Sequence, residues 1–297
     1  MKARIKALAE EKNAIILAHN YQPAEIQDLA DLCGDSLELS IKASQTSADI
    51  IVFCGVHFMA ETAAILSPDK TVLLPNPDAG CPMADMVTPE ALVQRKRELG
   101  NIPVITYVNS SAAVKAVSDV CCTSANVVKV VNGLDAPEVL MTPDRNLARY
   151  AAAHTEKKIH LWEGHCPFHN DLTPEEVKAA KAAHPQAEFV AHPECPMEIL
   201  ELAHAIKSTS GMIQYAQESP AKEFILGTEV GILHPIALAN PGKTFHPASK
   251  NTICADMKRI RPEQICHSLE TLEGQVSVPE ETRIKALGAV QKMIAMK

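Results

Sequence analysis

Three of the nine cysteines in this chain recur at a regular spacing that suits a shared metal centre. Cys81 and Cys166 are 85 residues apart, and Cys166 and Cys254 are 88 residues apart. Thiolates are soft ligands of the kind that iron–sulfur clusters use. With three protein ligands, one iron keeps an open position that can bind a substrate and act as a Lewis acid. The spacing therefore predicts one iron–sulfur centre built from three distant parts of the chain.

Cys166 also lies in a local pattern that could hold zinc instead. His165, Cys166 and His169 form a His-Cys-x-x-His sequence, and either Cys195 or His192 could complete a tetrahedral site. A lone Cys-x-x-His is a weak signal, so this alternative stays second. Other cysteines lie in apolar helix or strand patterns or in a pair at an expected helix end, and we expect them to be structural: Cys33, Cys54, Cys266, Cys121 and Cys122.

Polar pairs follow three apolar runs at matching offsets of 88 and 85 residues. Members of a pair are two residues apart, so they point to the same face of a strand. The pairs are His19 with Tyr21, Tyr107 with Asn109, and His192 with Glu194. They combine acid–base groups with hydrogen-bond donors. A single pair could merely satisfy a loop, but three at matched offsets predict a shared site.

Three hydroxyl residues, Ser36, Ser124 and Thr209, show the same offsets of 88 and 85. Each precedes a helical pattern, so we expect N-cap residues, and capping is their simplest role. Three helix N-termini directed at one cavity would also bind several anionic groups. The expected substrate is therefore a polyanion, such as a dicarboxylate with or without a phosphate.

These offsets imply that a unit of about 86 residues occurs three times in the chain. Short apolar runs typical of buried parallel strands are found at residues 14–18, 103–107 and 188–191. A Pro-Glu pair, which suits a helix N-terminus, follows Thr88, Thr173 and Arg261.

Within a unit we expect the order strand, helix, polar turn, helix, strand, helix, strand. In the first unit the expected helices are residues 23–33 and 37–45, and the next strand is residues 50–54. The expected domains are residues 1–84, completed by residues 266–297, then residues 85–169 and 170–265.

Alternating strands and helices predict an α/β fold of three similar αβα three-layer sandwich domains with parallel sheets. In such sheets, ligands bind at the carboxyl ends of the strands. Three units packed about a pseudo-threefold axis would bring those ends to an active site in a central cavity. A side-by-side array with separate sites is the alternative.

Composition excludes several functions. The net charge of −8 and the 4% aromatic content argue against a nucleic-acid surface. No G-x-G or Walker sequence occurs, so the common nucleotide-binding fingerprints are absent. The apolar run at residues 50–56 is too short to cross a membrane. Glu10 and Glu11 stand where a signal peptide needs apolar residues, so we expect a cytoplasmic protein.

The sequence closely resembles the A-type quinolinate synthase family of de novo NAD biosynthesis over nearly its whole length. The resemblance rests on these segments: 16–22 (ILAHNYQ), 34–36 (GDS), 58–61 (FMAE), 81–84 (CPMA), 107–110 (YVNS), 123–126 (TSAN), 143–147 (PDRNL), 164–167 (GHCP), 192–195 (HPEC) and 208–209 (ST).

The resemblance implies a transferase that condenses iminoaspartate with dihydroxyacetone phosphate to give quinolinate, phosphate and water. It implies a [4Fe–4S] cluster on Cys81, Cys166 and Cys254, and a partner, an L-aspartate oxidase or dehydrogenase, that supplies iminoaspartate. Glu194 and Tyr21 resemble proton-transfer residues, and Tyr107 and His19 would polarise the substrate. Implied substrate contacts are His19, Ser36, Tyr107, Val108, Asn109, Ser124, His192, Pro193, Glu194 and Thr209.

Two other functions fit a cluster with one cysteine per unit. A diphthamide-type radical enzyme would need a site for S-adenosylmethionine and a protein partner. An iron–sulfur sensor would not need matched polar pairs around the metal. The pairs at the strand ends therefore favour an enzyme that acts on a small dicarboxylate.

Overall fold

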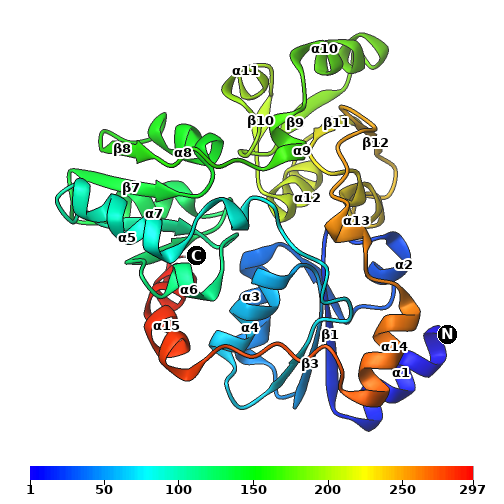
Figure 1. Cartoon of the computed structure of the whole chain (residues 1–297). Helices are drawn as coiled ribbons and strands as arrows, with labels where there is room; N and C mark the ends of the chain where they lie inside the picture. The colour runs from blue at the N-terminus through cyan, green and yellow to red at the C-terminus, as the bar shows by residue number, and fades with distance from the viewer. Residues whose placement is uncertain (297) are drawn as a thin grey trace.

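The computed structural model describes residues 1–296 and builds the first unit around a parallel sheet (Figure 1). Its strands are β1 (Ala14–His19), β2 (Leu32–Gly34), β3 (Ile50–Cys54) and β4 (Thr71–Leu73). Its helices are α1 (Lys2–Glu11), α2 (Ala24–Gln27), α3 (Ser36–Gln45) and α4 (His57–Leu66), with the 3-10 turn η1 (Ala84–Met86) after the sheet. Strand β3 is buried along its whole length, as its apolar sequence predicts.

The second unit repeats this arrangement. Its strands are β5 (Val104–Tyr107), β6 (Val120–Cys122), β7 (Glu138–Thr142) and β8 (Lys158–Leu161). Its helices are α5 (Pro89–Glu98), α6 (Ala112–Lys115), α7 (Val127–Gly133), α8 (Arg145–Ala152) and α9 (Pro167–Asn170).

The third unit follows the same plan. Its strands are β9 (Glu188–Ala191), β10 (Ala205–Ile206), β11 (Glu223–Gly227) and β12 (Thr244–Pro247). Its helical segments are α10 (Pro174–Ala183), α11 (Met197–Leu200), α12 (Thr209–Glu218), η2 (Val230–Ile232), α13 (Leu233–Ala239) and η3 (Asp256–Lys258). The helices α14 (Pro262–Thr271) and α15 (Glu280–Ala295) come last.

All three sheets are parallel and share one strand order. The orders are β2-β1-β3-β4, β6-β5-β7-β8 and β10-β9-β11-β12. The chain starts each sheet on an inner strand, visits one edge and then crosses to the other side. Parallel sheets with such a reversal form a crevice at the carboxyl end of the first strand. The common order confirms the α/β fold with three similar units.

The expected helix over residues 23–33 is wrong. Helix α2 ends at Gln27, and the chain then runs into edge strand β2, which pairs with β1. Asp31 holds this path, because its carboxylate accepts the backbone N–H of Ile16 at 2.8 Å. The corresponding edge strands β6 and β10 stand where a polar turn was expected. Strands of two or three residues are too short to show an alternating pattern.

The Pro-Glu pairs do begin helices, as predicted, and the first residues of α5, α10 and α14 are Pro89, Pro174 and Pro262. Thr88 and Thr173 cap the first two through their hydroxyls, at 3.2 and 3.3 Å from a backbone N–H. A proline at this position lacks only an N–H that the helix could not use.

The last two helices return to earlier parts of the fold. Helix α14 packs against α1, whereas α15 lies between the first two units and packs against α4, α6 and β6 (Figure 1). Its buried face consists of Ala286, Ala289, Val290 and Met293. Within residues 1–296, no helix is both long enough and apolar enough to span a bilayer.

Candidate active site

One cavity collects side chains from the carboxyl ends of all three sheets. The predicted residues that line it are Cys81, Cys166, Cys254, His19, Tyr21, Ser36, Tyr107, Asn109, Ser124, His192, Glu194 and Thr209. Because each unit contributes to the same cavity, the alternative of an array with separate sites is wrong. Two implied substrate contacts lie elsewhere: Val108 is buried outside the lining, and Pro193 lines a neighbouring cleft together with Ser124.

The two histidines at the strand ends are held in one tautomer by the backbone. Tyr21 N–H donates to His19 Nδ1 at 3.1 Å, and Glu194 N–H donates to His192 Nδ1 at 3.4 Å. Nε2 of each ring therefore carries the proton, and His192 Nε2 donates to Ser124 at 3.2 Å. Burial lowers the pKa of both His19 and His192 to about 3. At neutral pH both rings are uncharged hydrogen-bond donors.

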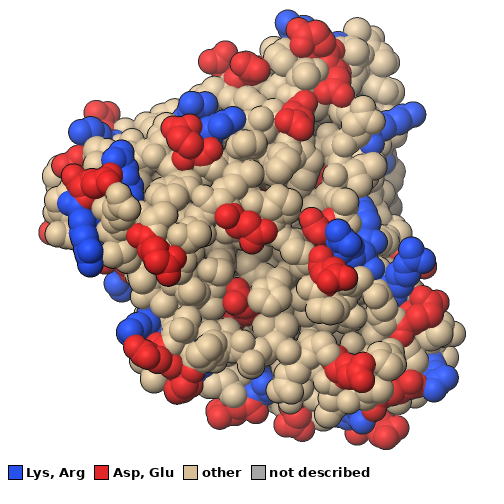
Figure 2. All heavy atoms as spheres, viewed as in Figure 1, with Lys and Arg blue, Asp and Glu red and all other residues tan. Residues whose placement is uncertain are grey.

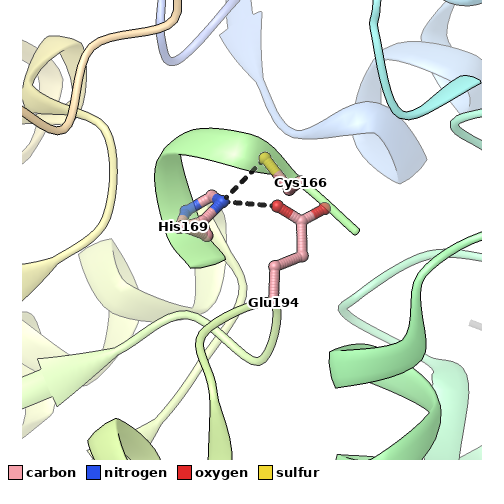
Figure 3. A group of neighbouring side chains, drawn as sticks. All are labelled: Cys166, His169 and Glu194. Atoms are coloured by element: carbon pink, nitrogen blue, oxygen red, sulfur yellow. Dashed lines mark hydrogen bonds and ion pairs between the residues drawn. The ribbon is translucent and has the colours of Figure 1, made fainter. Parts of the chain in front are cut away.

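A continuous chain of hydrogen bonds joins Tyr21 to Glu194. His169 Nδ1 lies 2.6 Å from a Glu194 carboxylate oxygen (Figure 3). Its Nε2 lies 2.8 Å from the Thr228 hydroxyl. The Tyr21 hydroxyl lies 2.5 Å from the same Thr228 oxygen. With Nδ1 donating to Glu194, Nε2 accepts from Thr228, which leaves Thr228 free to accept from Tyr21. This order allows a proton to pass between the two ends.

Burial and neighbouring groups determine the charges of the residues in this hydrogen-bonded network. Burial alone raises the pKa of Glu194, but His169 and His192 outweigh it and hold that pKa below its ordinary value. Burial, reinforced by the nearby Glu194, raises the pKa of both Tyr21 and Tyr107. Tyr107 also hydrogen-bonds to Glu194. The carboxylate is thus ionised and accepts hydrogen bonds from Tyr107 and His169.

The three cavity cysteines fit a metal centre. Burial raises the pKa of Cys81 to about 12 and of Cys254 to about 11, and it raises the pKa of Cys166 as well. Alone, these thiols stay protonated and unreactive, whereas a bound metal cation deprotonates its thiol ligands. The soft, convergent donor set therefore matches an iron–sulfur cluster. Cys121 and Cys122 belong to strand β6, not to a helix end, and are buried away from the cavity lining.

Two carboxylates fix the backbone at these cysteines. Asp144 accepts the N–H of Cys166, and Glu229 accepts the N–H of Cys254, both at 3.2 Å. Neither carboxylate was singled out from the sequence, although they are 85 residues apart and therefore follow the repeat. Val56 stands at the same offset in the first unit, so that unit has no carboxylate at this position.

The local zinc alternative is confirmed for Cys166 and His169 as neighbours, but Glu194 completes the group in place of the expected Cys195 or His192. Ligand atoms of Cys166, His169 and Glu194 lie within 4.8 Å of one another, but Cys195 and His192 are not part of this group. Figure 3 shows the His169 ring directed at both Cys166 and Glu194. Because both ring nitrogens of His169 are engaged in hydrogen bonds, a metal here would have to displace one of them. The group is better explained as a hydrogen-bonded network.

The expected N-cap role of the three hydroxyl residues is wrong. Asp35 and Ser208 cap helices α3 and α12, so Ser36 and Thr209 are the first residues inside those helices. Ser124 lies two residues before Asn126, which precedes α7. Asp, Asn and Ser are all strong N-cap residues, and the sequence pattern did not separate Asp35, Asn126 and Ser208 from the hydroxyl residues beside them. All three residues line the cavity, where Ser124 accepts from His192 and Thr209 accepts from Asn20 at 3.0 Å, so each of these two hydroxyls can still donate to a ligand.

Other lining residues were missed because apolar side chains at helical or strand spacing look like ordinary core. They are Val56, Phe58, Met83, Phe168 and Met257. The cavity also holds an unsatisfied polar atom, since Asn109 Oδ1 is buried without a hydrogen-bond partner. Buried polar atoms are rarely left unpaired, so this oxygen indicates a place for a bound ligand.

Comparisons with known proteins identify the chain's relatives. The family described as "Quinolinate synthetase A protein" matches residues 3–295. "Quinolinate synthase" of Geobacter sp. (strain M21) is 55% identical over 296 residues, which cover 100% of this chain and 97% of the relative. "Quinolinate synthase 1" of Methanosarcina acetivorans is 53% identical over 294 residues, covering 99% and 97%. "Quinolinate synthase" of Dehalococcoides mccartyi is 51% identical over 291 residues, covering 98% and 96%.

Proposed function

Because this chain belongs to the quinolinate synthetase A family, we propose that it is a quinolinate synthase of NAD biosynthesis. The reaction would be the condensation of iminoaspartate with dihydroxyacetone phosphate to quinolinate, phosphate and water, catalysed by a transferase. The observation that carries this proposal is the single cavity in which three regularly spaced cysteines meet the polar strand ends of all three units.

We assign the ligands of a [4Fe–4S] cluster to Cys81, Cys166 and Cys254. When bound, the cluster would supply a Lewis-acidic iron with an open position. The cavity supports this assignment because all three thiols line it and because Asp144 and Glu229 hold the backbone of two of them.

Substrate binding would rely on dipoles and neutral donors. No Lys or Arg of residues 1–296 is among the side chains that line the cavity. The helices α3 and α12 begin at its edge with Ser36 and Thr209, and helix N-termini attract carboxylate and phosphate groups. Ser124 and Asn109 would add hydrogen bonds. This arrangement suits a polyanion without leaving an unpaired lysine or arginine buried after release.

Proton transfer would use the hydrogen-bonded network that joins Tyr21 to Glu194. The network would first carry a proton from Tyr21 to Glu194: Tyr21 gives its proton to Thr228 as Thr228 protonates His169 Nε2, and His169 passes its Nδ1 proton to the ionised Glu194. Glu194 could then donate that proton to the substrate, and the Tyr21 phenolate could take up a proton that the substrate releases. His19 and Tyr107, both neutral, would polarise substrate oxygens.

We further propose that the protein works in the cytoplasm and receives iminoaspartate from an L-aspartate oxidase or dehydrogenase. Figure 2 supports the expectation that nucleic acid is not a partner, because acidic and basic side chains are interspersed on the face shown and form no basic stripe.

The decisive experiment is anaerobic purification followed by iron and sulfide analysis and an assay for quinolinate. About four irons per chain and quinolinate formation from both substrates are expected. Reductive cleavage of added S-adenosylmethionine would instead indicate a radical enzyme. A cluster without any turnover of the two substrates would indicate a sensor.

A further inference from the structure

A second group of metal-ligand side chains lies at the opposite end of the third sheet. His184 follows helix α10, Glu223 is the first residue of β11, and His246 is on the neighbouring strand β12. Their donor atoms lie within 4.8 Å of one another. Glu223 lies at the amino end of β11, whereas the central cavity lies at the carboxyl ends of the strands. The group is therefore separate from the proposed active site.

The three side chains converge on one point. His184 Nδ1 and His246 Nε2 both lie 2.9 Å from the same oxygen of Glu223. The two imidazole rings are stacked, with centroids 3.5 Å apart and an angle of 17° between their planes. Zinc bonds of 2.0–2.1 Å at tetrahedral angles place ligand atoms about 3.3 Å apart. A small outward shift of each side chain would admit the ion.

Surroundings of the group favour a hydrated cation. All three side chains are 23–31% exposed, and His184 and His246 line a surface hollow. Water can therefore complete the coordination that three protein ligands leave open. His184 also caps the C-terminus of α10, where the helix dipole is negative. Lys250 lines the same hollow, but the carboxylate of Glu176 lies there too and accepts a hydrogen bond from Ser249.

The second unit contains a natural comparison. Glu138 begins β7 as Glu223 begins β11, and His160 is the third residue of β8 as His246 is of β12. The two side chains of this pair lie 2.7 Å apart.

The third ligand is missing from that unit. Leu99 follows α5 where His184 follows α10, and the ammonium group of Lys158 lies 3.5 Å from Glu138. The repeat therefore supplies a histidine–glutamate pair twice, but it becomes a three-ligand group only in the third unit.

From this geometry we propose that His184, Glu223 and His246 bind one divalent transition-metal ion of the zinc class. Two imidazole nitrogens and one carboxylate oxygen are the ligands that Zn²⁺ accepts when water fills the fourth position. The bound ion joins the C-terminus of α10 to strands β11 and β12. Its role is structural, and it is independent of the reaction proposed above.

The test is calorimetric titration of Zn²⁺ into anaerobically purified, iron-loaded protein, in which the cavity thiols are occupied. His246→Gln should weaken the binding of one zinc equivalent by at least the roughly 10–100-fold that loss of an outer-shell partner costs. His160→Gln, which changes the matching histidine of the second unit, should bind zinc as the parent does. Glu223→Gln keeps the shape and hydrogen bonds of the side chain and should lose the same equivalent as His246→Gln.

Zinc should also raise the melting temperature of the parent and of His160→Gln, but not of the other two variants. The proposal is overturned if either His246→Gln or Glu223→Gln binds zinc with the parent's affinity and stoichiometry. Equal losses of zinc affinity in His160→Gln and His246→Gln would overturn it as well. The third ligand, His184, would then make no difference to zinc binding between the two units.

Discussion

Histidine–carboxylate groups lie at both ends of the third sheet, and burial makes them chemically different. At the cavity, the side chains of Glu194, which lines it, and of His169 behind it are 4% and 0% exposed. At the amino end, those of His184 and Glu223 are 31% and 30% exposed. The inner group has protein partners for every nitrogen, whereas the outer group remains open to water. Residue type alone therefore does not decide between proton transfer and metal capture.

The cause lies in the cost of an unpaired charge. Burial of an uncompensated carboxylate away from water costs free energy. The Glu194 carboxylate is therefore surrounded by His169, His192 and Tyr107. Each partner restricts where a proton can sit. At the surface, water compensates the charge, and the same side chains can exchange partners or accept an ion.

The largest effect is expected from the cavity cysteines. Cys81→Ala, Cys166→Ala or Cys254→Ala should abolish the proposed cluster and the activity, because each change removes one of only three thiolate ligands assigned to it. Iron content and the visible absorption of anaerobic protein measure the loss. Cys266→Ala, on helix α14, is the control and should retain both. If Cys195→Ala loses the cluster while Cys254→Ala keeps it, the assignment of the ligands from the repeat is wrong.

A smaller effect, on the order of 10²–10⁴ in rate, is expected from Glu194→Gln. Glutamine keeps the size of the side chain but cannot take up a proton, so the cluster should survive while kcat falls. Glu138→Gln, in the half-buried histidine–glutamate pair of the second unit, is the matched control and should turn over normally. Tyr21→Phe should resemble Glu194→Gln if both ends of the network move protons. Parent-rate turnover by Glu194→Gln with an intact cluster would remove Glu194 from the mechanism.

Removal of a cavity hydroxyl should reduce the activity less than either change above. Thr209→Ala should raise KM or lower kcat roughly tenfold, since a hydrogen bond to a charged group contributes about 1.5 kcal/mol. The neighbouring Ser208→Ala removes a true N-cap and should instead lower the free energy of unfolding by about 1 kcal/mol. Kinetics and urea unfolding of the two variants separate the roles. Unchanged kinetics in Thr209→Ala, Ser36→Ala and Ser124→Ala would exclude an anion site.

The smallest effect is a slope of stability with pH. The pKa of His192 is about 3 in the folded protein and near 6.5 when unfolded, so the unfolded chain binds more protons below pH 6.5. Stability should therefore fall as pH drops from 6.5 toward 3, by at most about 1.4 kcal/mol per pH unit for this group. His192→Asn should flatten the slope in anaerobic urea unfolding at pH 7, 6 and 5. An unchanged slope would mean that His192 is not buried uncharged.

The sequence predicted elements that carry strong local signals. The apolar run at residues 50–54 is β3, and the Pro-Glu pairs begin α5, α10 and α14. Short edge strands such as β2 were missed, because their place is determined by pairing with β1 and not by their own pattern.

The same distinction applies to the site. Periodicity identified the cysteines and the polar strand ends because each unit supplies one. His169 and Thr228 have no equivalent in the other units, since Met257 and Pro143 stand at the matching offsets. Their joint contact with the network arises only from the packing of the units, which no repeat in the sequence reveals.

Helix α15 also bears on the order in which the molecule can assemble during synthesis. It is translated after all three sheets, yet it covers β6, α6 and α4. Near its end, the carbonyl oxygens of Met293 and Met296 accept hydrogen bonds from Asn126 at 3.0 and 3.3 Å, and Asn126 in turn accepts the N–H of Thr123, beside Ser124. In a nascent chain that still lacks this helix, the surface of β6, α6 and α4 that it covers is exposed to water, and one wall of the cavity lacks its support. The cavity can therefore take its final form only after ribosomal synthesis has passed α15.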